Sequence, residues 1–254
     1  MSYALEIEGV SHWFGSNKVL NDINLQIADG QIVAVVGPSG CGKSTLLKLM
    51  IGLIEPSTGS VRFEGEELTR SNVLECRRRM GYVLQEGGLF PHLSARANVT
   101  LMARYLGQMS RAQIDDRTLE LAVLTHFPQE ALDRYPLQIS GGQRQRGAIL
   151  RALMLEPEVM LLDEPMGALD PMIRFRLQED LRPIFQTLKK TVVLVTHDMA
   201  EAGFFSDDVI LLREGRIVQR GTLNDMLTKP ADPWVLEFIE AQRGLPRKDE
   251  EAES

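Results

Sequence analysis

Several features are scarce in this sequence, and each scarcity narrows the class of protein. Only two cysteines, Cys41 and Cys76, occur among the 254 residues, and they do not have the spacing of a metal site. We therefore expect the protein to work in a reducing compartment. Acidic residues outnumber basic ones by 35 to 28, and the net charge of −7 argues against a nucleic-acid partner. No apolar run approaches the roughly 18–20 residues that span a bilayer. Residues 1–10 include Glu6 and Glu8, so no signal peptide is expected.

The overall composition is typical of a folded domain. Hydrophobic residues make up 44% of the chain and charged residues 25%, and the length suffices for one large domain or two small ones. Between residues 89 and 155, Leu, Ala, Gln and Arg in helical spacing replace the valine-rich runs found on either side. We therefore expect an α/β fold with a helical insertion. The charged residues 244–254 are expected to be disordered.

The strongest motif is the stretch Gly37–Thr45, which matches the phosphate-binding pattern G-x-x-x-x-G-K-[ST]. An apolar run at 32–36 precedes it and apolar residues in helical spacing follow at 46–50, which is the strand–loop–helix context of such a site. Lys43 would lie along the terminal phosphates, and the Ser44 hydroxyl would take one position on Mg²⁺. The alternative is a glycine-rich turn with a surface lysine. The candidate nucleotide-binding residues are Gly37, Pro38, Ser39, Gly40, Cys41, Gly42, Lys43, Ser44 and Thr45.

Two other buried strands lead into residues suited to hydrolysis. The apolar run 159–162 ends in Asp163 and Glu164, and the run 191–196 ends at His197. Asp163 would reach Mg²⁺ through water, Glu164 could deprotonate an attacking water, and His197 could hydrogen-bond a γ-phosphate. Solvated charge for the acidic pair and a structural role for the histidine are the alternatives.

A second anion-binding surface is predicted where Ser140, Gly141, Gly142 and Gln143 open a helical pattern. Ser140 and Gln143 have the spacing of a capping box, and the exposed N–H groups of a helix N-terminus attract anions. An ordinary helix cap is the alternative.

Two aromatic residues, Trp13 and Phe14, precede Gly15 in a predicted loop between strands at 4–10 and 23–27. They are either a hydrophobic plug or a platform on which a nucleotide base stacks.

Taken in their order along the chain, these motifs resemble those of the ATP-binding subunit of an ABC transporter, and the resemblance covers residues 5–243. The corresponding motifs are Walker A at Gly37–Thr45, the Q-loop Gln85, the signature Ile139–Gln143, Walker B at Met160–Asp163 with Glu164 after it, the D-loop Ala168–Asp170 and the H-loop His197.

This resemblance implies a head-to-tail homodimer that binds ATP between one subunit's Walker A and its partner's signature. Residues 140–143 would contact the γ-phosphate held by the other subunit, and Asp170 would carry information across the interface. Phe14 resembles the base-stacking aromatic, with Trp13 close enough to compete.

For hydrolysis, the resemblance implies that Glu164 acts as the base and that His197 contacts the γ-phosphate. Gln85, Ser44 and Asp163 would hold Mg²⁺.

The resemblance also implies membrane partners. The groove beside Gln85, with residues 89–91, would receive a permease, and a solute-binding protein would act through that permease. The chain would be peripheral, on the cytoplasmic face of the membrane. The stretches 164–171, 196–202 and 230–233 are similar to the glycine betaine/choline importer branch; importers of nitrate, sulfonate or amino acids, and a soluble ABC ATPase outside transport, are the alternatives.

The implied fold is a P-loop NTPase core with an antiparallel β subdomain and a helical subdomain. Residues 1–243 would form a single ABC ATPase domain, with its core at 1–88 and 156–243 and its helical subdomain at about 89–155.

Overall fold

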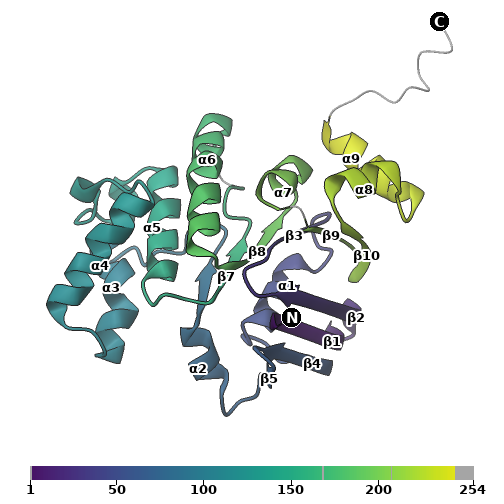
Figure 1. The fold of residues 1–254 in the computed structure, drawn as a ribbon, viewed down its shortest axis with the longest axis horizontal. Coiled ribbons are helices and arrows are strands. Elements are labelled where there is room, and N and C mark those ends of the chain that lie inside the picture. The colour runs from purple at the N-terminus through teal and green to yellow at the C-terminus, as the bar shows by residue number, and fades with distance from the viewer. Residues whose placement is uncertain (1, 168, 207, 244–254) are drawn as a thin grey trace, which may run out of the picture.

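The computed structural model describes residues 2–167, 169–206 and 208–243, and it contains two sheets with helices on both sides (Figure 1). Residues 244–254, for which disorder is predicted, lie outside the described residues, and so does the D-loop residue Ala168. Among the helices that the structure describes, none combines the length and the apolar character needed to cross a bilayer.

The larger sheet has six strands in the order β10-β9-β3-β8-β7-β6. Five of them run parallel and β10 is antiparallel to β9, so the carboxyl ends of the five meet at one edge. The strands are β3 (Ile32–Val36), β6 (Met80–Val83), β7 (Val159–Asp163), β8 (Thr191–Thr196), β9 (Asp208–Arg213) and β10 (Arg216–Gly221).

Alternate residues of β3 show why this sheet is covered on both faces. Val33 and Val35 join one hydrophobic core, with α1 (Lys43–Met50) and the second sheet. Ala34 and Val36 point the other way, into a core formed with the last three helices. Because successive side chains of a strand alternate, an all-apolar run can be stable only between two layers. Those helices are α7 (Met199–Phe205), α8 (Leu223–Thr228) and α9 (Pro233–Arg243).

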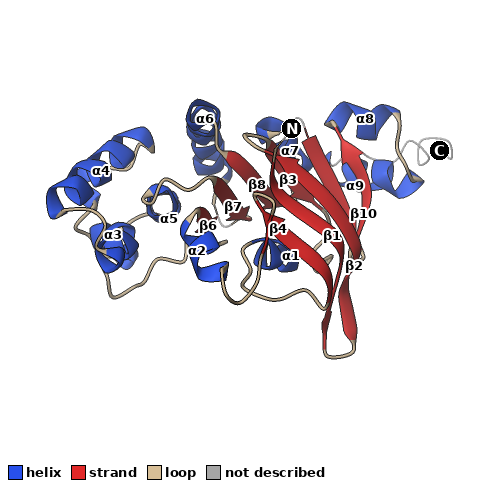
Figure 2. Ribbon diagram, turned by 60° about the horizontal axis from the view of Figure 1, so that its bottom comes forward, coloured by secondary structure: helices blue, strands red, loops and turns tan. Residues whose placement is uncertain are grey.

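The second sheet is antiparallel, in the order β2-β1-β4-β5, and lies beside α1 (Figure 2). Its first strand corrects a sequence-based expectation, because Trp13 and Phe14 belong to β1 rather than to a loop: Trp13 pairs with Lys18 and Phe14 with Asn17. Register shifts along β1 interrupt the apolar alternation by which a strand is recognised. The strands are β1 (Tyr3–Phe14), β2 (Asn17–Ala28), β4 (Thr58–Phe63) and β5 (Glu66–Glu67).

Helices gather at the β6 end of the larger sheet, where they share a core with Met160 and Leu162 of β7 (Figure 1). The predicted fold class, an α/β core with an antiparallel β subdomain and a helical insertion, is thus confirmed. The helical elements at this end are α3 (Ala95–Leu106), α4 (Arg111–Leu124), the short 3-10 turns η1 (Gln129–Ala131) and η2 (Pro136–Gln138), α5 (Gly141–Leu153) and α6 (Pro171–Leu188). The remaining helix, α2 (Val73–Arg78), precedes β6 and buries Cys76 in the core that contains α1.

Candidate active site

The loop between β3 and α1 has a backbone that suits an anion. Gly42, its last residue, has a φ of 108° and supplies no side-chain cap to α1, so the first-turn N–H groups are not bonded to a capping side chain. A Cβ on Gly42 would lie 2.7 Å from Cδ2 of Leu20, so both conformation and space require glycine. The loop therefore presents the start of a helix at the carboxyl edge of the parallel sheet.

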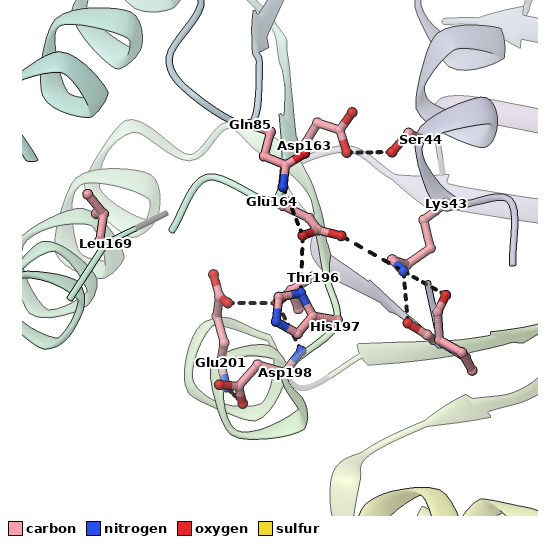
Figure 3. Close-up of polar contacts among 12 residues, drawn as sticks. Lys43, Ser44, Gln85, Asp163, Glu164, Leu169, Thr196, His197, Asp198 and Glu201 are labelled. Atoms are coloured by element: carbon pink, nitrogen blue, oxygen red, sulfur yellow. Dashed lines mark hydrogen bonds and ion pairs between the residues drawn. The ribbon is translucent and has the colours of Figure 1, made fainter. Parts of the chain in front are cut away.

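Lys43 is the buried cation of this loop, with 4% of its surface exposed. Its Nζ donates to the carbonyl oxygens of Gly37 (2.8 Å) and Pro38 (3.0 Å) and lies 3.9 Å from Oε1 of Glu164 (Figure 3). An ammonium group held among oxygens at the mouth of an anion-binding loop can transfer these contacts to phosphate oxygens.

Asp163, at the carboxyl end of β7, faces the same loop. Its Oδ1 accepts a hydrogen bond from Ser44 Oγ (2.9 Å), and the Tyr82 hydroxyl lies 3.4 Å from Oδ2. Burial raises the pKa of Asp163, because the ionised carboxylate is poorly solvated there. The described residues hold no cluster of three or more His, Cys, Asp or Glu that could enclose a metal by themselves.

The oxygens of Ser44, Asp163 and Gln85 are hard ligands of the kind that Mg²⁺ prefers, and this ion is normally held by few protein groups and by substrate phosphates. The chemistry of these three side chains therefore fits Mg²⁺.

Glu164 is the residue on which the candidate catalytic groups converge (Figure 3). Its Oε2 lies 3.1 Å from Nδ1 of His197 and 3.5 Å from Nε2 of Gln85. Its backbone has a φ of 43°, held by a hydrogen bond from its N–H to the Val195 carbonyl at 2.9 Å. Positive φ in a residue with a Cβ is costly and is found at functional sites, where the surrounding structure imposes it. Here the turn brings the carboxylate to within 3.9 Å of Nζ of Lys43.

His197 follows β8 directly and is half exposed. Asp198 caps α7 with hydrogen bonds from the N–H groups of Ala200 and Glu201, so the chain turns sharply at the histidine. Gln242 of α9 adds a contact from another element, because its amide donates to the His197 carbonyl at 2.7 Å.

The predicted second anion site forms a capping box at the start of α5, as expected. Ser140 accepts from the Gln143 N–H, and the Gln143 side chain accepts from the Ser140 N–H. Gly142 is buried, and a Cβ on it would lie 2.8 Å from Ile173 of α6. Within the described part of the chain, no hydrogen bond or ion pair joins residues 140–143 to residues 37–45.

Asp170 is the N-cap of α6, where its Oδ1 accepts from the N–H groups of Met172 (3.1 Å) and Ile173 (3.0 Å). Its role across an interface stays a prediction.

Phe14 and Trp13 differ in how far their rings are available. Phe14 has 52% of its surface exposed and meets His12 edge-on at 4.7 Å between ring centres. The ring of Trp13 is covered by Lys18, whose Nζ lies 4.8 Å from its centre. Phe14 is therefore the better platform for a base.

The predicted residues Gln85, Asp163, Glu164 and His197 thus lie together beside the loop 37–45. Residues 140–143 make no hydrogen bond or ion pair with that loop within the described part of the chain. Sequence reasoning did not single out four supporting residues: Tyr82, Thr196, Glu201 and Gln242. The Asp-x-x-Glu spacing of Asp198 and Glu201 was a signal for a helix cap, and the contacts of Tyr82 and Gln242 come from tertiary packing without a local signal.

Comparison with known proteins agrees with this geometry. A family model described as ABC transporter matches residues 20–167. The chain is 45% identical, over 94% of its length, to the choline transport ATP-binding protein OpuBA of Bacillus subtilis. The chain belongs to the ABC transporter ATP-binding family. The resemblance inferred from the motifs is confirmed.

Other ABC relatives give the same assignment. The chain is 45% identical to the glycine betaine uptake system ATP-binding protein YehX of Escherichia coli, over 92% of this chain and 76% of that protein. This chain spans 63% of the length of OpuBA, and less than two thirds of the length of each of the first two curated relatives.

Among solved ABC structures, a dimeric post-hydrolysis state of the cassette MJ0796 bound to ADP and Pi matches with a TM-score of 0.77 and 33% identity, over 86% of this chain and 98% of that chain. CbiO1 of Clostridium perfringens, part of the transporter complex cbiONQ, matches with a TM-score of 0.81 and 27% identity, over 95% and 96%.

Proposed function

We propose that this chain is the ATP-hydrolysing subunit of an ABC importer for quaternary-amine osmoprotectants such as glycine betaine or choline. The observation that carries the proposal is the convergence of Lys43, Gln85 and His197 on the Glu164 carboxylate, beside the phosphate-binding loop. Residues 1–243 act as one ATPase domain, with a core at 1–88 and 156–243 and a helical subdomain at about 89–155.

In this proposal Glu164 accepts a proton from the attacking water, and Nδ1 of His197 orients the Glu164 carboxylate until His197 turns to the γ-phosphate. Lys43 transfers its hydrogen bonds from loop carbonyls to phosphate oxygens. Ser44, Gln85 and Asp163 would hold Mg²⁺, which when bound would neutralise charge on the phosphates. Phe14 stacks on the adenine.

The separation of residues 140–143 from the loop supports a dimer in which each ATP lies between one subunit's Walker A and its partner's signature. Ser140 is exposed and Gly141 is partly exposed at the start of α5, where their hydroxyl and N–H groups could meet a partner's γ-phosphate. The dimeric cassette named above gives independent support.

A cavity of about 370 Å³ between α2, β6, α3 and α5 supports docking of a membrane permease. Its polar lining comes from Arg77, Arg78, Tyr82, Tyr105 and Arg151, and the rest is mainly apolar. Neither Gln85 nor residues 89–91, beside which the groove was predicted, line it. Arg151 also donates to the carbonyls of Gly87 (3.0 Å) and Gly88 (2.7 Å), which follow Gln85. We place the chain on the cytoplasmic face of the membrane, as a peripheral subunit, with a solute-binding protein acting through the permease.

Two measurements test this proposal. The chain should co-purify with an integral-membrane partner and hydrolyse ATP faster when that complex is supplied with its solute. Sulfate/thiosulfate import ATP-binding proteins are nearly as similar, at 40–43% identity, so glycine betaine, choline and sulfate should be compared in one uptake assay. Uptake of sulfate alone would refute the osmoprotectant assignment, and recovery with ribosomes or DNA would refute transport.

A further inference from the structure

A buried carboxyl group that the proposed mechanism does not use lies next to His197. Glu201, on α7, has 5% of its surface exposed, and its Oε2 accepts a hydrogen bond from Thr196 Oγ1 at 2.7 Å (Figure 3). Thr196 is the residue directly before His197 and is itself buried. The carboxyl group therefore bonds to the strand end from which the histidine projects.

The arrangement departs from an ordinary capping box. With Asp198 as N-cap, a glutamate three residues later normally accepts the N-cap N–H. Here the Asp198 N–H donates instead to Thr196 Oγ1 at 3.1 Å, and the Thr196 hydroxyl donates its own hydrogen bond to Oε2 of Glu201. Glu201 thus fixes the direction of the Thr196 hydroxyl, and that hydroxyl closes the turn around His197.

Stability alone does not explain a carboxyl group at this position. The second oxygen of Glu201, Oε1, is buried and has no hydrogen-bond partner among the described residues. A buried polar atom left without a partner lowers stability, and an apolar side chain of similar size would avoid that loss. Groups retained at such a cost are expected where position matters for chemistry.

We propose that Glu201 is a positioning residue for His197: through Thr196 it fixes the turn that directs the imidazole Nδ1 at Glu164. The inference rests on the proposed function, because it gives the histidine a role in hydrolysis. Glu201 lies one side chain removed from the reacting groups, so its effect should appear in turnover rather than in ATP binding.

Matched pairs of variants isolate the hydrogen-bond relay. Glu201→Gln keeps an acceptor for the Thr196 hydroxyl and Glu201→Met removes it at similar volume; Thr196→Ser keeps the hydroxyl and Thr196→Val removes it. We expect Glu201→Met and Thr196→Val to lower kcat about tenfold with the KM for ATP within about twofold, the effect of losing about one buried hydrogen bond. The conservative partner of each pair should restore most of the turnover.

A readout that does not depend on activity is the ¹⁵N NMR signal of the His197 imidazole. It should shift or broaden in Glu201→Met and Thr196→Val and stay near the wild-type position in Glu201→Gln. An unchanged His197 signal and an unchanged kcat in Glu201→Met, whatever the change in Tm, would overturn the inference.

The two proposals fail in different ways. In a His197→Ala background, Glu201→Met should lower kcat no further, because the imidazole that Glu201 positions is already absent. A further tenfold loss there would refute the positioning role. Full turnover in His197→Ala alone would refute the proposed function of the histidine, whatever the NMR of Glu201 variants shows.

Discussion

Replacing Glu201 with glutamine should change how the stability of the fold depends on pH. Burial raises the pKa of Glu201 from 4.5 to about 7, and Asp198 adds to the rise, while Thr196, Arg174 and His197 oppose it. Between these two values the folded chain keeps a proton that the unfolded chain has released. The free energy of unfolding therefore falls as the pH rises through this window and is constant above it.

The size of the effect follows from the two pKa values. One pKa unit is worth about 1.4 kcal/mol, so ionising Glu201 costs the folded state about 3 kcal/mol in full, of which about 2 kcal/mol falls between pH 5.5 and 8.5. Glutamine carries no charge at any pH and should not show this loss. Relative to wild type, Glu201→Gln should gain about 2 kcal/mol across that range.

Urea unfolding at closely spaced pH values measures this difference, since all other titrating groups are common to both chains. Solubility is lowest near the isoelectric point, which is about 5.3 for this sequence. The range from pH 5.5 to 8.5 lies above that point. Stability curves that run parallel for wild type and Glu201→Gln would refute the reasoning, because the carboxyl group would then titrate alike in the folded and unfolded states.

Three further predictions concern the nucleotide site. Glu164→Gln should bind ATP normally, lose at least about a hundredfold in turnover and accumulate as an ATP-bound dimer on size exclusion; turnover near the wild-type rate would contradict its role as base. Lys43→Ala should weaken ATP binding by about tenfold or more in calorimetry, since a charge-assisted hydrogen bond to phosphate is worth about 1.5–3 kcal/mol. Phe14→Ala should weaken binding by about 1–3 kcal/mol and Trp13→Ala by much less; the reverse order would assign stacking to Trp13.

Much of the site could be predicted because its signals are local. The loop at 37–45, the acidic pair after a buried strand and the capping box at Ser140 each depend on a few neighbouring residues, and the structure shows each element as expected. The meeting of Gln85, Glu164 and His197 follows from parallel strands that end at one edge.

Other features could not be predicted, for physical reasons. Trp13 and Phe14 were placed in a loop because register shifts in β1 break the alternation that marks a strand. The spacing of Asp198 and Glu201 predicts a capping box, but the competing acceptor, Thr196 Oγ1, becomes available only once β8 and α7 are joined by their turn.

The position of Arg151 explains how events at the cavity could reach the catalytic residues. Its guanidinium group lines the cavity and, through two hydrogen bonds, holds the backbone that follows Gln85. Ser140 is the N-cap of the same helix, so α5 connects the signature with the segment of Gln85. Because a helix is stiff along its axis, a displacement of α5 moves both ends together. If the proposed permease docks beside Arg151, we therefore expect a displacement of α5 to move Gln85 relative to Glu164 and to reorient Ser140.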